Sequence, residues 1–282
     1  MVDAYAHPES LVSTDWVAQN SGDPKVVLAE VDVDTAAYDQ GHIQGAVGWN
    51  WKSQLQDSLT RDLLTGAQLE RLLGQAGISN DTTVVLYGDN NNWFAAWAFW
   101  FLKLYGHREL KLMNGGRAKW VAERRALTTE PTKRAAATYR AGKPDLSLRA
   151  MRDYVLSAVT RPNAVQLVDV RSPQEYKGEL LAPPALPQEG AQRPGHIPGA
   201  RNIPWGTAVA EDGTFKPASG LRKVYGDRGI TGAGEVIAYC RIGERSAHTW
   251  FVLHQLLGYD KVRNYDGSWT EWGSLVGAPI ER

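Results

Sequence analysis

Short apolar runs alternate with longer stretches of helical periodicity along the second half of the chain. The apolar runs cover residues 165–170, 200–203, 236–239 and 261–265, and apolar residues recur at helical spacing in 151–159, 219–228, 245–257 and 268–275. This alternation predicts βα units, and therefore a mostly parallel sheet with helices on both of its faces. The predicted fold class is α/β, in which ligands gather beyond the carboxyl ends of the strands.

The two halves of the chain repeat the same residues at a constant distance. Five residues of the first half recur 152 positions later (239 minus 87), because Tyr87, Gly106, Asn114, Gly115 and Trp120 match Tyr239, Gly258, Asp266, Gly267 and Trp272. The period is far too long for a solenoid and indicates a duplicated domain. We predict a first domain at 1–125, a linker at 126–145 and a second domain at 146–282.

A second pair of matching segments locates an insertion. Gly41-His42-Ile43 recurs as Gly195-His196-Ile197 with a slightly different offset, so the second half is longer here. We place the extra residues in 176–194, which is rich in Pro, Gln and Gly, and we expect a surface loop. Because the Gly-His-Ile segment occurs in both halves, we interpret its histidines as structural.

Cys240 is the only cysteine of the chain, and it directly follows the apolar run 236–239. It opens the segment Cys-Arg-Ile-Gly-Glu-Arg-Ser at 240–246, which precedes a predicted helix. Backbone N–H groups of such a strand-to-helix turn, together with Arg241 and Arg245, favour an anion. We therefore expect the pKa of the thiol to fall below its usual value of about 8.5, with Glu244 opposing the fall, and no general base to be needed. The segment predicts a nucleophile, and a small buried core cysteine is the alternative.

The repeat provides an internal control for this prediction. Opposite 240–245 the first half has Gly88, Asp89, three asparagines and Trp93, so the loop has kept its length and lost the thiol and both arginines. Because the first half keeps this loop without Cys or Arg, the fold does not require them. We therefore expect the first domain to be catalytically silent.

Four residues separate Cys240 from Arg245, one fewer than in cysteine phosphatases, and this smaller ring suits a single sulfur atom better than a phosphate. The segment 240–246 is similar to the thiosulfate-using branch of the rhodanese family, of the actinobacterial type. The mercaptopyruvate-using branch has Cys-Gly-Ser-Gly instead, and Arg241 argues against it. The resemblance covers nearly the whole chain and implies two tandem rhodanese-like domains, of which the second is active.

The resemblance also implies a reaction. Cys240 would take the sulfane sulfur of thiosulfate as a persulfide and pass it to cyanide, a dithiol or a protein thiol. Arg245, Arg241, Gly243 and Ser246 would bind the substrate, and no metal or other cofactor is implied. The alternatives are a sulfur carrier or redox sensor that does not turn over, and a 3-mercaptopyruvate sulfurtransferase.

Composition narrows the partners and the compartment. With 31 basic and 31 acidic residues the formal net charge is +0, so we expect neither nucleic acid nor a membrane as a partner. A single cysteine excludes an intrachain disulfide and a Cys-rich zinc site and fits the reducing cytoplasm. The apolar run 93–102 is too short to span a bilayer and predicts a buried helix. Arg171, which stands where the first half has Asp32, faces either the site or a carboxylate such as Asp169.

Overall fold

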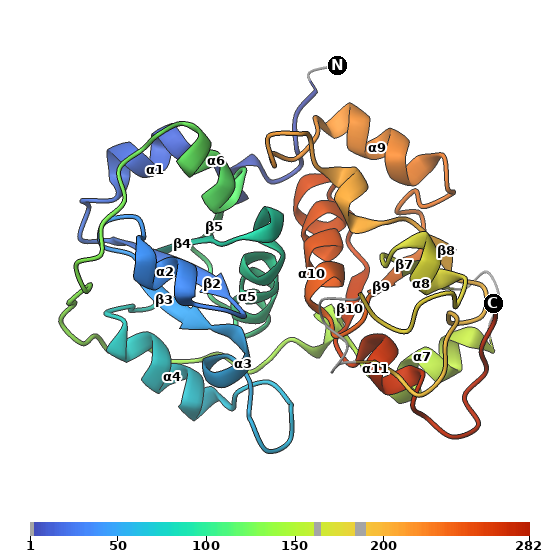
Figure 1. The fold of residues 1–282 in the computed structure, drawn as a ribbon. Coiled ribbons are helices and arrows are strands. Elements are labelled where there is room, and N and C mark those ends of the chain that lie inside the picture. Colours follow the sequence, from blue (N-terminus) through green and yellow to red (C-terminus); the bar gives the residue numbers. More distant parts are fainter. Residues whose placement is uncertain (1–2, 161–164, 184–189) are drawn as a thin grey trace. The chain divides into compact units, whose positions relative to one another are not determined.

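The computed structural model describes residues 3–160, 165–183 and 190–282 (Figure 1). These residues form two compact units. One unit holds Glu9–Asp145 and Val209–Phe215, and the other holds the remaining described residues. Within the described residues, no helix is both long and apolar enough to cross a membrane.

Each unit is built around a sheet of five parallel strands. The strand order is β1-β5-β4-β2-β3 in the first unit and β6-β10-β9-β7-β8 in the second, so the two topologies are equivalent strand by strand. The strands of the first sheet are β1 (Leu11–Val12), β2 (Val26–Asp32), β3 (Val47–Asn50), β4 (Thr83–Tyr87) and β5 (Leu110–Met113). Those of the second are β6 (Arg149–Ala150), β7 (Val165–Asp169), β8 (Arg201–Asn202), β9 (Glu235–Tyr239) and β10 (Val262–Tyr265).

Helices follow the strands in both halves. In the first half they are η1 (Pro8–Ser10), α1 (Thr14–Asn20), α2 (Ala36–Gln40), α3 (Trp51–Gln54), α4 (Gly66–Gln75), η2 (Asn90–Asn92), α5 (Trp93–Leu104) and α6 (Gly116–Ala122). In the second half they are η3 (Leu146–Leu148), α7 (Arg152–Val159), α8 (Pro173–Tyr176), η5 (Trp205–Ala208), α9 (Ala218–Gly226), α10 (Glu244–Phe251), the π-helical turn η6 (Val252–Leu256) and α11 (Ser268–Trp272). The predicted α/β class and the predicted buried helix at 93–102 are confirmed.

Both faces of each sheet are covered. On β2, Val26 and Leu28 pack in one cluster with residues of α1 and α6, whereas the alternate residue Val27 is equally buried on the opposite face, where α5 contacts the sheet. In the second unit, α7 and α11 contribute to the cluster on one face, and α10 packs against β9 and β10. Strands buried on both faces explain why the sequence shows continuous apolar runs.

The repeated Gly-His-Ile segments make the same contacts in both units. The ring of His42 stacks on Tyr38 with 3.9 Å between ring centroids, and that of His196 stacks on Tyr176 with 3.6 Å. In each case the histidine Nδ1 hydrogen-bonds the backbone oxygen of the same tyrosine, at 2.9 Å and 2.8 Å. These contacts fix local structure in both halves and agree with the structural interpretation of the histidines.

Two short elements of the second half are absent from the prediction. The two-residue strand β6 and the one-turn helix α8 lie in stretches where too few residues establish a period. The predicted insertion loop falls partly outside the described residues, because 184–189 are not described. Tyr176 belongs to α8, and the described parts at 177–183 and 190–194 contain no strand or helix. The first part is mostly exposed, whereas Ala191 in the second is buried in the core.

Candidate active site

Cys240 lies at the carboxyl end of β9, where the chain turns into α10. The turn ends at Gly243, whose φ of 98° is in the left-handed region. A side chain at this position would also meet Asp266, because a Cβ there would lie 2.7 Å from Oδ1 of that carboxylate. Only glycine satisfies both conditions, so the glycine determines how the loop closes.

Hydrogen-bond donors of the loop point at the sulfur. The backbone N–H of Gly243 donates to Cys240 Sγ at 3.1 Å, and the Ser246 hydroxyl lies 3.6 Å from Sγ. The same hydroxyl also donates to Asn264 Oδ1 at 2.6 Å, which is the shorter contact. The backbone N–H is therefore the more direct stabiliser of negative charge on the sulfur.

The predicted fall in the pKa of the Cys240 thiol is wrong. Cys240 is fully buried, and this desolvation raises its pKa above the ordinary value. The charge of Glu244 raises it further, and Arg245 and the hydrogen bonds from Ser246 lower it by less. The sequence shows the two arginines but not the burial, and burial disfavours the charged form.

Glu244, the first residue of α10, contacts the thiol directly. The Cys240 thiol donates to Glu244 Oε2 at 3.2 Å. The other oxygen, Oε1, lies 3.7 Å from Arg241 Nη2 and 3.6 Å from Arg245 Nε. Glu244 is completely buried, so this carboxylate forms the centre of the loop.

The Arg245 guanidinium is paired with a carboxylate that the sequence analysis missed. Its Nη1 and Nη2 donate to the two oxygens of Glu175, each at 3.0 Å. Burial alone would raise the pKa of Glu175, but the Arg245 hydrogen bonds and charge hold it below its usual value. Glu175 lies on α8, and the available signal was the capping box that begins at Ser172.

The structure places all five predicted site residues in this one loop. Cys240, Gly243 and Ser246 meet at the sulfur, whereas Arg241 and Arg245 meet at Glu244. Two guanidinium groups and the two carboxylates of Glu175 and Glu244 leave this buried cluster, called the pocket below, without net charge.

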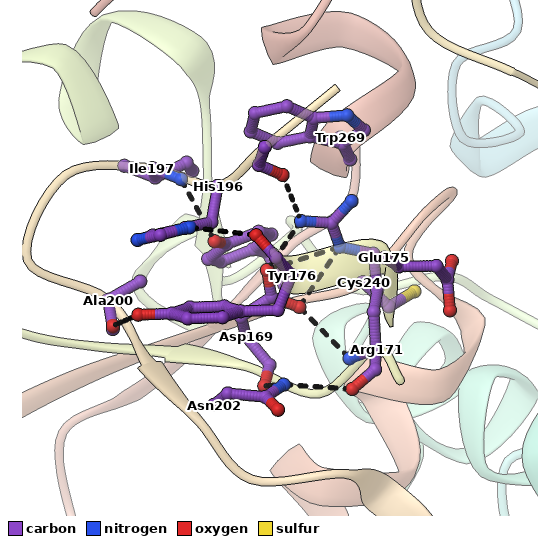
Figure 2. Close-up of polar contacts among 12 residues, drawn as sticks. Asp169, Arg171, Glu175, Tyr176, His196, Ile197, Ala200, Asn202, Cys240 and Trp269 are labelled. Carbon is purple, nitrogen blue, oxygen red and sulfur yellow. Dashed lines mark hydrogen bonds and ion pairs between the residues drawn. The ribbon is translucent and has the colours of Figure 1, made fainter. Parts of the chain in front are cut away.

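Arg171 faces the Asp169 carboxylate, as one of the two expected arrangements has it (Figure 2). Its Nε and Nη2 donate to the Asp169 carboxylate, at 3.0 Å and 2.6 Å to the nearer oxygens, and Nη2 also donates to Gly195 O at 2.7 Å. The guanidinium lies 4.5 Å from the ring centroid of Trp269, whose backbone N–H donates to Cys240 O. Arg171 therefore acts on the loop through its neighbours.

The corresponding loop of the first unit is held by an asparagine. The backbone N–H of Gly88 donates to Asn92 Oδ1 at 3.0 Å, and Asn92 Nδ2 donates to Met113 O at 2.7 Å. Asn90, Asn91 and Asn92 have φ of 47°, 55° and 66°, a region that asparagine tolerates better than most residues. This loop has no thiol and no arginine, and Asn92 takes the position of Glu244.

Known proteins resemble this chain over both of its halves. The family model for the rhodanese-like domain matches residues 13–123 and 151–275. A protein of Mycolicibacterium smegmatis named "Putative thiosulfate sulfurtransferase" is 58% identical over 276 residues, covering 98% of this chain and 99% of that protein. A protein of Thermus thermophilus named "Sulfur carrier protein TtuD" is 56% identical over 280 residues, covering 99% of this chain and 98% of that protein.

Solved structures share the fold at lower identity. The 3-mercaptopyruvate sulfotransferase SseA of Escherichia coli superimposes with a TM-score of 0.78 at 24% identity, covering 92% of this chain and 98% of that chain. The anaerobic ergothioneine biosynthesis enzyme of Chlorobium limicola gives a TM-score of 0.83 at 24% identity, covering 98% of this chain and 71% of that chain. The predicted pair of rhodanese-like domains is thereby confirmed.

Proposed function

The chain belongs to the rhodanese-like family, and from this premise we propose that it is a sulfurtransferase that carries the sulfane sulfur of thiosulfate on Cys240. The observation that carries the proposal is the contrast between two equivalent loops. One has a thiol that receives a hydrogen bond from Gly243, and the other has Gly88 and asparagines. The names of the relatives support thiosulfate as the donor.

The reaction proceeds in two transfers. The sulfur of Cys240 attacks the outer sulfur of thiosulfate, the bond to the sulfonate sulfur breaks, and sulfite leaves with its electron pair. A thiol acceptor or cyanide then attacks the persulfide and restores Cys240. The Gly243 N–H, 3.1 Å from Sγ, stabilises negative charge that develops on Sγ as it attacks and when it leaves the persulfide.

We assign the sulfonate group of the donor to the two arginines of the loop, with Arg245 as the main contact. Each Arg245 terminal nitrogen has one bond to Glu175, and guanidinium groups have five donor hydrogens. Arg241 adds positive potential, and Ser246 adds a hydroxyl near the sulfur. The thiosulfate dianion would thus bind next to two guanidinium groups whose positive charges Glu175 and Glu244 already balance.

Mass spectrometry of the intact protein tests the proposal. After thiosulfate is added, wild type should gain the mass of one sulfur atom and lose it in a chase with cyanide or a dithiol. Cys240→Ser should gain nothing. Failure of wild type to take up sulfur, or equal uptake by Cys240→Ser, contradicts the proposal.

A second function is a sulfur carrier that holds the persulfide for a partner protein, and the relative of Thermus thermophilus favours it. The two functions differ in turnover. A carrier keeps a stable persulfide when small acceptors are added, whereas the sulfurtransferase releases many equivalents of product per protein. A redox sensor would instead form a sulfenate on Cys240 and gain the mass of oxygen.

A further inference from the structure

Glu244 is a buried carboxylate in contact with the reacting sulfur. Its Oε2 lies 3.2 Å from Cys240 Sγ, a distance over which a proton can pass between the two groups. Its Oε1 accepts no hydrogen bond from the described residues. The nearest guanidinium nitrogens, Arg245 Nε and Arg241 Nη2, lie 3.6 Å and 3.7 Å from Oε1, farther than the thiol sulfur lies from Oε2.

None of the other ionisable groups described around the loop is a better acceptor for the thiol proton than Glu244. Arg241 and Arg245 are cations, and Glu175 is held by Arg245. Asp266, which faces Gly243, is paired with Arg149 at 3.0 Å. His248, on the same helix, is fully buried, and this desolvation lowers its pKa to about 3.

Charge balance explains why the proton must stay in the pocket. The two arginines balance Glu175 and Glu244 only while the thiol is neutral. Ionisation of the thiol with release of the proton to solvent would leave a net negative charge in a buried site, which is costly. If the proton moves to Glu244, the pocket stays neutral.

We propose that Glu244 is the general base of the sulfur transfer and stores the thiol proton while Cys240 carries sulfur. This role rests on the function proposed above. In the first transfer the thiol proton moves to Glu244 Oε2 as Sγ bonds the sulfane sulfur and sulfite leaves with its two negative charges. The products are a persulfide anion and a neutral carboxylic acid, so the total charge is unchanged. In the second transfer the acceptor removes the outer sulfur, and Cys240 takes the proton back.

The silent loop supports this assignment. At the position of Glu244 it has Asn92, whose shorter side chain ends in an amide that cannot take up a proton. The first half therefore lacks the base as well as the nucleophile.

Glu244→Gln tests the proposal, because glutamine keeps the shape and removes the base. Persulfide formation is measured in a single turnover with thiosulfate by rapid quench and intact mass, from about pH 6 to pH 9. We expect a nearly flat profile for wild type. For Glu244→Gln we expect a rate about a hundredfold lower near neutral pH that rises about tenfold per pH unit, because only thiolate formed by release of the proton to solvent reacts.

Two further variants complete the design. Glu244→Asp keeps a carboxylate and should keep the flat profile at a reduced rate. Glu235→Gln, at the opposite end of β9 and paired with Arg263, should behave as wild type.

The sign of the effect separates a base from a simple charge. Loss of a negative charge alone would favour the anionic donor and speed up the reaction, so a Glu244→Gln protein that reacts as fast as wild type, or faster, overturns the proposal. If Glu244→Gln does not fold, the wild-type profile decides: a wild-type rate that rises tenfold per pH unit also overturns the proposal. A wild type that takes up no sulfur overturns the proposed function instead.

Discussion

The two halves of the molecule have the same sheet order and the same Tyr–His contacts, but they differ in how the loop after the central strand is filled. After β9 the loop encloses a sulfur atom beside Glu244 and two arginines. After β4 the amide of Asn92 takes the place of these groups and bonds the backbone directly. The fold therefore keeps this loop with or without those side chains, whereas the proposed chemistry depends on them.

A second difference concerns the arginine that pairs with a buried carboxylate in each unit. In the first unit Arg117 pairs with Glu30 at 2.9 Å and donates to Gly41 O. In the second, Arg171 pairs with Asp169 and donates to the matching Gly195 O. The two arginines stand at different positions of the repeat, because Trp269 matches Arg117 and Asp32 matches Arg171. Both units therefore place a guanidinium group between a buried carboxylate and the backbone oxygen of the repeated glycine, although the arginine comes from a different position of the repeat in each unit.

Exchanging the residues at the start of the two loops should have the largest effect. Cys240→Ser should abolish sulfur uptake, and Gly88→Cys in that background should not restore it. A Cβ at residue 88 would lie 2.4 Å from Val31 O, so no side chain fits there without a shift of the backbone. Intact mass after thiosulfate addition measures both, and uptake by the double variant would show that the silent loop needs only a thiol.

Arg171 and Arg117 give the next largest effect. Arg171→Ala leaves the buried Asp169 without its partner and should lower the free energy of unfolding by about 3–5 kcal/mol. Arg117→Ala should cost less, because the Arg117 side chain is 12% exposed and water reaches the vacated place. Urea unfolding followed by fluorescence measures both losses. A larger loss for Arg117→Ala would contradict this ranking.

The loop arginines test which cation binds the donor. Arg245→Ala should slow persulfide formation by about a hundredfold, as loss of a charge-stabilising donor does, and Arg241→Ala by less than about tenfold. Because Arg245→Ala also strands Glu175, the double variant Arg245→Ala/Glu175→Gln serves as the control that keeps the pocket neutral. Equal effects of the two single variants, or full activity of the double variant, would remove the assigned hierarchy.

The fold could be predicted from the sequence because it leaves local and repeated signals. Apolar runs mark β7 and β9, and the constant spacing of residues such as Tyr87 and Tyr239 marks the duplication. These signals survive because strands buried on both faces need continuous apolar residues.

The environment of Cys240 could not be predicted in the same way. Glu175 is 70 positions from Arg245 in sequence, and nothing local indicates that the two groups pair. The raised pKa of Cys240 follows from complete burial, which depends on how α10 packs against the sheet. Charges near in sequence therefore predicted a thiolate, whereas desolvation in three dimensions favours the neutral thiol.

The smallest expected effect concerns Asp32, which matches Arg171 in the repeat. Burial raises the pKa of Asp32 to about 8, and the charges of Asp89 and Glu30 add to this rise against the hydrogen bond from the Asp89 N–H. Between about pH 4, where the unfolded carboxyl ionises, and about pH 8, the folded protein binds the extra proton, so stability falls as pH rises. Asp32→Asn stays neutral and should match wild type near pH 4 and exceed it by up to a few kcal/mol near pH 8. Urea unfolding across this range measures the difference, with the exposed Asp39→Asn as the control. If the difference in the free energy of unfolding between Asp32→Asn and wild type is constant over this pH range, the Asp32 carboxyl is already ionised in the folded protein. The two halves would then carry opposite charges at this position, Asp32 a negative and Arg171 a positive one.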